Sequence, residues 1–201
     1  MSIKLFTGPM YCGKTRSMLL EGEKHERAGR TVVYLKSALD DRYGRNTLTV
    51  SHDGIKRESF AVNGSFSAEI KEACLKADVV CIDEAQFING VAGFCDEMAR
   101  VHHKRVLVAA LDGDFERKPF ESIVELLPLC DKFTKLNSVC VECGHHAPFT
   151  RKIGGSISER VDVGGAEKYV PTCRQHHSDS PVTEVAIERM KAINGRLSKS
   201  K

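Results

Sequence analysis

The stretch from Gly8 to Thr15 constrains the fold more than any other part of this 201-residue chain. It reads GPMYCGKT and matches the phosphate-binding loop pattern G-x-x-x-x-G-K-T at every fixed position. An apolar run precedes it and a helical pattern begins at Lys14, as the strand, loop and helix of such a site require. The alternative is a plain glycine turn between a strand and a helix. Because N–H groups of such a loop bind phosphate oxygens, we predict a nucleotide-phosphate site made by Gly8, Pro9, Met10, Tyr11, Cys12, Gly13, Lys14 and Thr15.

Four side chains predict the chemistry of this site. Lys14 is expected to reach the β- and γ-phosphates, and the Thr15 hydroxyl to bind Mg²⁺. A second apolar strand pattern ends in Asp83 and Glu84. Asp83 is predicted to bind Mg²⁺, directly or through water, and Glu84 to reach a nucleophile from the other side of the strand. The alternative is a strand that merely ends in acids.

Strand and helix patterns alternate along residues 1–136 and predict a parallel α/β sheet flanked by helices, a phosphate-loop nucleotide-binding domain. Strands are expected at 3–6, 31–35, 57–62, 77–82, 105–111 and 131–136, and helices from 14, at 66–76, 94–101 and 121–127. The first helix is expected to bury Met18, Leu19 and Leu20. A long polar loop at 36–54 contains Asp40, Asp41 and Arg42, which either contribute to the phosphate site or lie on a solvated loop.

Two pairs of metal-binding residues define a second part of the chain at 137–180. Cys140 and Cys143 form one C-x-x-C pair, and Cys173 with His176, or with His177, forms the other. Thiolates and imidazole favour a four-coordinate structural Zn²⁺ site. Scattered thiols with a surface histidine pair, or a redox C-x-x-C, are the alternatives.

The segment between these pairs, 147–172, contains two Gly-Gly pairs and predicts a flexible loop tied at its base by the metal. Such a loop is a candidate lid over a substrate, and the alternative is a disordered insertion. Residues 181–201 are expected to form a C-terminal helix and a partly disordered basic tail.

Composition narrows the classes of partner and compartment. The net charge is only +3, aromatic residues make up 6% and there is no Trp, which argues against a nucleic-acid-binding surface. No apolar run approaches the roughly 20 residues that span a bilayer, so no membrane partner is expected. The N-terminal MSIKLFTGPM does not read as a signal peptide, and the eight cysteines therefore read as reduced thiols and metal ligands. We expect a reducing, cytoplasmic location.

Several further motifs, taken in order, resemble one family: the zinc-containing thymidine kinases of the cytosolic, viral and bacterial type. The matching stretches are GPMYCGKT, DDRY, HDG, IDEAQF, LDGDFERKPF, KLNSVCVEC, FTRK, GGAEKY and CRQH, and they extend from the first strand through His176. The resemblance implies phosphorylation of the 5′-hydroxyl of thymidine, and of deoxyuridine, by ATP with Mg²⁺. It also implies a homotetramer that is inhibited by dTTP, and a role in pyrimidine salvage for DNA synthesis.

The resemblance assigns roles to matching positions. Lys14 and Thr15 would handle the phosphates and Mg²⁺, Asp83 would support the metal, Glu84 would be the general base and Arg42 would lie near the transferring phosphate. The nucleoside would be surrounded by Met10, Phe87, Phe115, Phe120, Thr150, Val161, Val163, Gly164, Gly165 and Tyr169.

The chain departs from the family pattern at several positions: Tyr11-Cys12 stands for the common Phe-Ser, Ala85 for Gly, Asp114 for Thr and His176 for a fourth Cys. None of these changes removes a catalytic group. Asp114 adds a charge beside the expected nucleoside pocket and bears on base selectivity.

Two other functions compete with the kinase. A phosphate-loop ATPase that grips nucleic acid with the zinc module and the basic tail is disfavoured by the low charge. A zinc-tied binding module without catalysis is disfavoured because Lys14, Thr15, Asp83 and Glu84 are all present.

Overall fold

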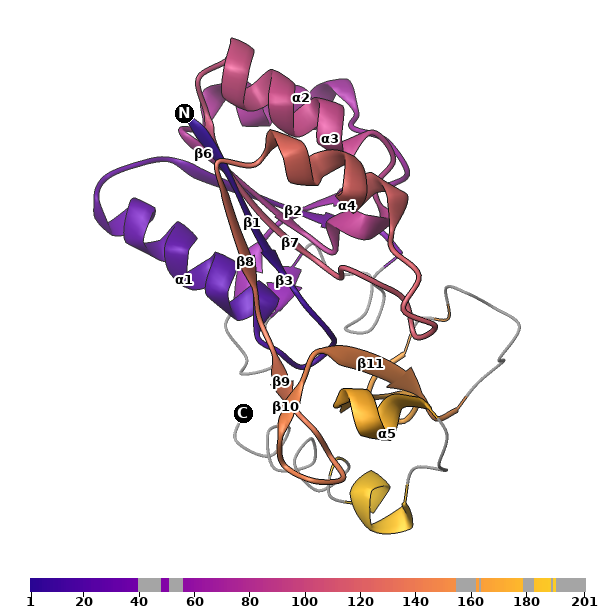
Figure 1. Ribbon diagram of the computed structural model, residues 1–201. Helices are drawn as coiled ribbons and strands as arrows, with labels where there is room; N and C mark the ends of the chain where they lie inside the picture. The colour runs from indigo at the N-terminus through magenta and orange to yellow at the C-terminus, as the bar shows by residue number, and fades with distance from the viewer. Residues whose placement is uncertain are drawn as a thin grey trace.

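The computed structural model describes residues 1–39, 48–50, 56–154, 162, 164–178, 183–188 and 190. Within them a six-stranded sheet in the order β5-β2-β6-β7-β1-β8 forms the centre of the fold, with every neighbouring pair parallel (Figure 1). Its strands are β1 (Ser2–Thr7), β2 (Val32–Ser37), β5 (Phe60–Val62), β6 (Val79–Asp83), β7 (Arg105–Ala110) and β8 (Lys132–Lys135). The predicted parallel α/β class is confirmed.

Helices cover both faces of this sheet (Figure 1). One face carries α1 (Lys14–Arg27), and the other carries α2 (Ala68–Lys76), α3 (Val91–Asp96) and α4 (Glu121–Leu126). Three short turns complete these layers: η1 (Ala85–Phe87), η2 (Glu97–Val101) and η3 (Leu127–Leu129). A separate antiparallel pair joins β3 (Leu48–Val50) to β4 (Lys56–Glu58).

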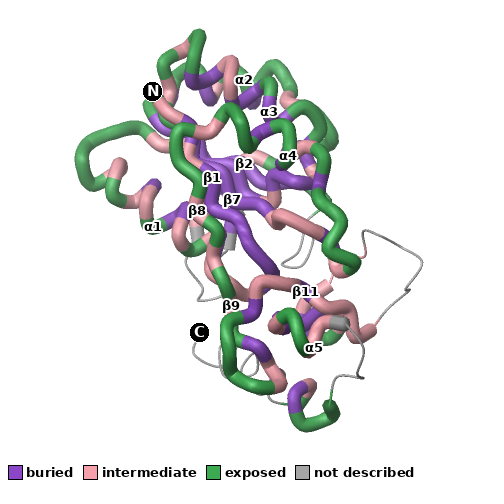
Figure 2. The backbone as a smooth tube through the Cα atoms, viewed as in Figure 1, coloured by how far each residue is buried: buried purple, intermediate pink, exposed green. Residues whose placement is uncertain are grey.

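The central strands β6 and β7 are mostly apolar because both of their faces are buried. In β6, Val80 and Ile82 pack with α2, α3 and α4, whereas Val79 and Cys81 pack with α1. Successive side chains of a strand point to opposite faces, so a strand covered on both sides shows no polar alternation. Figure 2 shows the buried residues concentrated along these central strands. In β6 the first polar residue is Asp83, at the carboxyl end, where ligands bind in sheets of this kind.

The first helix packs closer to the sheet than its sequence predicts. A Cβ built on Gly22 would lie 2.7 Å from the Tyr34 hydroxyl oxygen and 3.2 Å from the Cys81 sulfur, so glycine permits this approach. Met18 and Leu19 are buried as predicted, but the prediction for Leu20 was wrong, since this side chain is 39% exposed. Met18, Leu19 and Gly22 lie on the buried face of α1, and Leu20 lies outside it because successive helix residues turn by about 100°.

Other element boundaries differ by a few residues from those expected. The strand predicted at 57–62 is two strands, β4 and β5, which are separated at Ser59. The helix predicted at 94–101 begins earlier, at Val91, and ends in the π-helical turn η2. In α2 the side chain of Ser67 accepts a hydrogen bond from the Ile70 N–H and thereby caps the helix.

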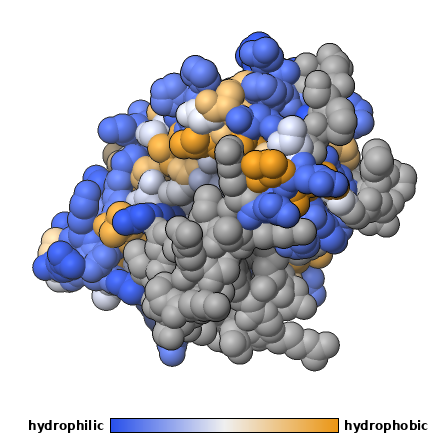
Figure 3. All heavy atoms as spheres, turned by 90° about the horizontal axis from the view of Figure 1, so that it is seen from below, coloured by the Kyte–Doolittle hydropathy of each residue, from blue (hydrophilic) through white to orange (hydrophobic). Residues whose placement is uncertain are grey.

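A small module follows the sheet. It contains the antiparallel pairs β9 (Ser138–Val139) with β10 (His146–Ala147) and β11 (Phe149–Lys152) with β12 (Tyr169–Thr172), then α5 (Arg174–Ser178). Residues 184–188 and 190 are helical, in agreement with the expected C-terminal helix. Residues 155–161 and 163 of the expected lid at 147–172 lie outside the described part. Viewed from the end that carries this module, hydrophilic residues make up most of the coloured surface and apolar residues gather near its middle (Figure 3). No helix among the described residues is long and apolar enough to cross a membrane.

Candidate active site and metal centre

The phosphate loop, residues 8–15, connects β1 to α1 through backbone conformations with positive φ. The φ angles are 138° at Gly8, 64° at Tyr11 and 86° at Gly13. A Cβ built on Gly8 would lie 2.3 Å from the carbonyl oxygen of Leu136, which is main chain and cannot rotate away. Only glycine therefore lets the loop pass the end of β8 at this distance.

Replacing Gly8 by Ala tests this close approach. We expect Gly8→Ala to destabilise the protein by about 1–3 kcal/mol, because the added methyl group overlaps the backbone, and to weaken ADP binding by distorting the loop. Denaturant unfolding and ADP titration measure the two effects. Gly29→Ala is the matched control, since Gly29 also has a positive φ (76°) but a Cβ there meets nothing within 4 Å. Equal stability losses in the two variants would contradict the proposed overlap.

Lys14 is buried against the loop that precedes it. Its ammonium group donates a hydrogen bond of 2.7 Å to the carbonyl oxygen of Pro9 and lies 3.9 Å from the Cys12 sulfur. Burial raises the pKa of the Cys12 thiol, although the positive charge of Lys14 opposes that shift. The loop thus holds the Lys14 ammonium group beside a neutral Cys12 thiol. Lys14 is the residue predicted to bind the phosphates.

The two predicted Mg²⁺ ligands lie together. The Thr15 hydroxyl donates a hydrogen bond of 2.9 Å to Asp83 Oδ1, which joins the first turn of α1 to the carboxyl end of β6. A hydroxyl and a carboxylate are the hard oxygen ligands that suit Mg²⁺, so the residues present fit this ion.

Glu84 is the next residue along the chain after Asp83. It follows β6 in the left-handed conformation (φ 50°, ψ 40°), which is uncommon for a residue with a side chain. Its Oε2 accepts a hydrogen bond of 2.6 Å from Gln86 Nε2, and Gln86 Oε1 accepts one of 3.0 Å from the Leu111 N–H. The sequence analysis missed Gln86, whose only signal is its place within the IDEAQF motif.

Among the side chains expected around a nucleoside, the structure shows separate small groups in contact. The rings of Phe87 and Phe120 meet edge to face, with centroids 5.9 Å apart. The Lys152 ammonium lies 5.0 Å from the ring centroid of Phe115 and 5.8 Å from that of Tyr169. These residues come from the segment after β6, the segment after β7, and the small module.

The same module contacts the phosphate loop directly. The Met10 N–H donates a hydrogen bond of 2.9 Å to Thr150 Oγ1 on β11. The Ser138 hydroxyl donates one of 3.2 Å to the carbonyl oxygen of Tyr11. Two contacts therefore fasten the loop to the module, on opposite sides of the Met10–Tyr11 peptide.

The remaining predicted nucleoside and phosphate positions divide into two groups. Arg42, Val161 and Val163 lie outside the described residues, as do Asp40 and Asp41. Gly164 and Gly165 are described, and the Gly165 N–H donates a hydrogen bond to the side chain of Glu167.

An ion-pair cluster lies beside these glycines. The Asp162 carboxylate pairs with Lys152 at 3.1 Å and also with Lys168. The Tyr169 hydroxyl donates a hydrogen bond of 2.7 Å to the Asp162 carbonyl oxygen. These pairs lower the pKa of the Asp162 carboxyl, with the hydrogen bond from Lys168 as the largest cause.

Asp114 holds a turn together. Its Oδ1 accepts hydrogen bonds of 2.9 Å from the N–H groups of both Glu116 and Lys118, and the residue is 6% exposed. The family resemblance places the Asp114 carboxylate beside the expected nucleoside pocket. In the structure this carboxylate orders the backbone after β7.

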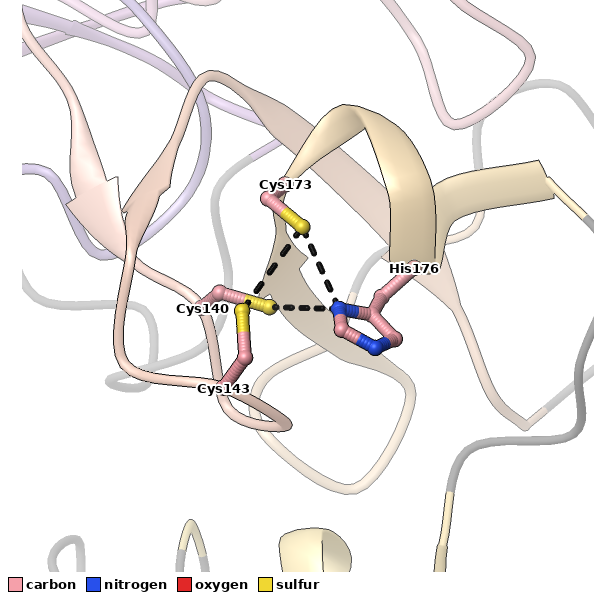
Figure 4. A group of neighbouring side chains, drawn as sticks. All are labelled: Cys140, Cys143, Cys173 and His176. Carbon is pink, nitrogen blue, oxygen red and sulfur yellow. Dashed lines mark hydrogen bonds between the residues drawn. The ribbon is translucent and has the colours of Figure 1, made fainter.

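The four residues Cys140, Cys143, Cys173 and His176 form one cluster (Figure 4). Their ligand atoms lie within 4.8 Å of one another, with 3.8 Å between the sulfurs of Cys143 and Cys173 and 3.2 Å from Cys173 Sγ to His176 Nδ1. A tetrahedral zinc site with bonds of about 2.3 Å has edges of about 3.8 Å between sulfurs. The cluster could therefore hold a zinc ion.

Neighbouring groups favour metal binding at this cluster. Burial opposes ionisation of the Cys140 thiol, but hydrogen bonds from the backbone N–H groups of Cys173, Cys143 and Glu142 lower its pKa to about 7. A thiolate is the form that binds zinc.

His177, the alternative ligand, lies elsewhere. Its ring meets Phe149 edge to face at 5.4 Å, and its Nε2 lies 3.2 Å from the Thr150 carbonyl oxygen. Burial lowers the pKa of His177. Within the described residues, His176 is the histidine of the metal cluster.

Comparisons with known proteins agree with this arrangement. A family model described as thymidine kinase matches residues 1–177. A thymidine kinase of Oryza sativa subsp. japonica is 40% identical over 196 residues, which cover 95% of this chain and 70% of that protein. Thymidine kinase a of Arabidopsis thaliana is 39% identical over 192 residues, with 94% and 80% covered.

A search of solved structures finds AMPPCP-bound DnaA from Aquifex aeolicus at a TM-score of 0.42 and 12% identity, covering 66% of this chain and 39% of that one. The chain thus spans well under half the length of that structure, and a similarity this low adds nothing to the assignment. The family model and the two plant enzymes decide it. This chain belongs to the thymidine kinase family.

Proposed function

We propose that this protein transfers the γ-phosphate of ATP to the 5′-hydroxyl of thymidine, and of deoxyuridine, giving the nucleoside monophosphate and ADP. The observation that carries this proposal is the junction at the end of β6, where Asp83 accepts a hydrogen bond from the Thr15 hydroxyl and the next residue, Glu84, accepts one from Gln86. Membership in the thymidine kinase family supports the choice of nucleoside.

Phosphoryl transfer depends on positioning and on neutralising charge. The N–H groups of the phosphate loop and the Lys14 ammonium stabilise negative charge on the β- and γ-phosphates. Thr15 and Asp83 would hold Mg²⁺, which when bound supplies positive charge beside the same oxygens. Arg42 is proposed to act near the transferring group, as the family motif implies.

Glu84 acts as the general base. Its carboxylate takes the proton of the 5′-hydroxyl, the nucleoside oxygen forms a bond to the γ-phosphorus, and the bond from that phosphorus to the bridging oxygen of ADP breaks. A positioned general base contributes about 10²–10⁴-fold in rate.

The nucleoside would lie between the aromatic residues and the small module. Met10, Phe87, Phe115 and Phe120 wall the base on the side of the sheet. The opposite wall comes from Thr150, Val161, Val163, Gly164, Gly165 and Tyr169. Because Thr150 already accepts the Met10 N–H at 2.9 Å, its contact with a nucleoside would be made while it also holds the phosphate loop.

The division of the chain follows the same proposal. Residues 1–136 bind the nucleotide, 137–180 hold structural zinc and cover the substrate, and 181–201 form the helix and tail. A homotetramer, inhibition by dTTP and a cytoplasmic location stay predictions from the family resemblance.

An assay of ADP release tests this function. With ATP, Mg²⁺ and protein present, we expect release to depend on added thymidine and to be weaker with deoxycytidine, because a buried group left unpaired by the wrong base costs about 1–3 kcal/mol. Release should also be weaker with uridine, whose ribose carries a 2′-hydroxyl that thymidine lacks. Single-stranded DNA should have no effect. Release that depends on DNA and not on thymidine would support the competing nucleic-acid ATPase.

A further inference from the structure

Gln86 connects Glu84 to the rest of the sheet. The side chain is 7% exposed and both ends of its amide are engaged. Nε2 donates to Glu84 Oε2 at 2.6 Å, and Oε1 accepts the Leu111 N–H at 3.0 Å. Glu84 directly follows β6 and Leu111 directly follows β7, so one amide spans the carboxyl ends of two adjacent parallel strands.

This arrangement restricts the amide to one orientation. Leu111 has a backbone N–H and can only donate, so the oxygen of Gln86 must face it and the NH₂ group must face Glu84. Rotation of the amide would break both hydrogen bonds. The backbone of Gln86 is held as well, since its carbonyl oxygen accepts the Ser122 hydroxyl at 3.3 Å. The donor that meets Glu84 is therefore fixed by contacts outside the active site.

Glu84 needs such a partner. It is half-buried, its own backbone is left-handed, and a glutamate side chain has three rotatable bonds. A neutral NH₂ donor orients the carboxylate while leaving its negative charge, and with it the capacity to accept a proton.

We propose that Gln86 is a positioning residue, whose side-chain amide orients the Glu84 carboxylate toward the hydroxyl that it deprotonates. This inference rests on the proposed function. It assigns to Gln86 an effect on turnover that passes through Glu84, with no contact to ATP or to the nucleoside.

A double-mutant cycle tests this role. In the wild-type background, Gln86→Met should lower kcat about 10–100-fold, because misplacing a catalytic group by about 1 Å has effects of this size. The KM values for ATP and thymidine should change by less than about threefold. In the Glu84→Gln background the same substitution should leave kcat unchanged, since residues that act as a unit are not additive. A residue that merely supports folding would lower kcat by the same factor in both backgrounds.

Ser122→Ala is the matched control. It removes one hydrogen bond to the Gln86 backbone but leaves both hydrogen bonds of the Gln86 amide, so kcat should fall by a smaller factor than in Gln86→Met. Thermal unfolding of every variant shows which chains are folded at the assay temperature.

Three results would overturn the role of Gln86. They are an unchanged kcat in Gln86→Met, an equal loss in both backgrounds, or a loss confined to KM. If Gln86→Met does not fold, a crystal structure of the wild-type chain with thymidine and a non-hydrolysable ATP analogue decides instead. An amide nitrogen more than 3.5 Å from both Glu84 oxygens in that structure overturns the proposal. A wild-type chain that is inactive on thymidine refutes the proposed function itself, which separates the two failures.

Discussion

Replacing Glu84 by Gln should lower the turnover of thymidine by about 10²–10⁴-fold, the contribution of a general base. Nucleotide binding should survive, because we propose that the phosphates bind the loop, Lys14 and the pair formed by Thr15 and Asp83. The hydrogen bond of 2.9 Å from the Thr15 hydroxyl to Asp83 Oδ1 does not involve Glu84. The amide of the new side chain can still meet Gln86 but cannot accept a proton. Steady-state kinetics with thymidine, together with ADP titration, measure the two effects.

Glu116→Gln is a suitable control for this variant. It neutralises an exposed carboxylate, paired with Lys118, in the turn after β7, and should retain wild-type kcat. If Glu84→Gln keeps more than about a tenth of the wild-type turnover, Glu84 is not the base. A variant that loses ADP binding together with turnover would also contradict the separation of roles.

Removing zinc should have the second large effect. The module has little apolar core, and binding energy at a structural zinc site is folding energy, about 10–16 kcal/mol in isolated zinc-finger peptides. We expect a chelator, or Cys143→Ser, to expose β11 and β12 to protease. Nucleotide binding should weaken too, because the module supplies Thr150 to the Met10 N–H and Ser138 to the Tyr11 carbonyl. Limited proteolysis and ADP titration, with the metal content measured, test both.

Cys130→Ser is the matched cysteine control. Cys130 lies outside the metal cluster, and its thiol donates to the Leu126 carbonyl oxygen at 3.3 Å, which a serine hydroxyl can also do. This variant should keep its zinc and its affinity for ADP. An unchanged ADP affinity in zinc-free protein would contradict the link between the module and the phosphate loop.

Local sequence patterns predicted the features that depend on neighbouring residues. The strand–loop–helix unit around Gly8 and Lys14 follows from glycine positions and apolar runs, and the sheet confirms it. The same holds for the C-x-x-C pair, whose spacing brings two sulfurs to one side of a turn. The spacing from Cys173 allowed either His176 or His177 to be the fourth ligand. Only packing distinguishes them, since the ring of His177 contacts Phe149.

Local patterns could not predict features that depend on contacts between segments far apart in the sequence. Gln86 meets Leu111 across 25 residues because β6 and β7 lie side by side, which no local pattern records. The use of Asp114 as a turn cap likewise depends on the backbone path from 114 to 118.

The hydrogen bonds at Met10 and Tyr11 limit how this chain can be divided. A fragment that stopped at residue 136 would retain all six strands, α1 and every letter of the phosphate signature. It would nevertheless lose the acceptor for the Met10 N–H and the donor to the Tyr11 carbonyl oxygen. Grafting the module with the Cys₃His cluster onto another nucleotide-binding sheet should fail for the same reason, since the two contacts between module and sheet domain are made at the loop that we propose holds the triphosphate.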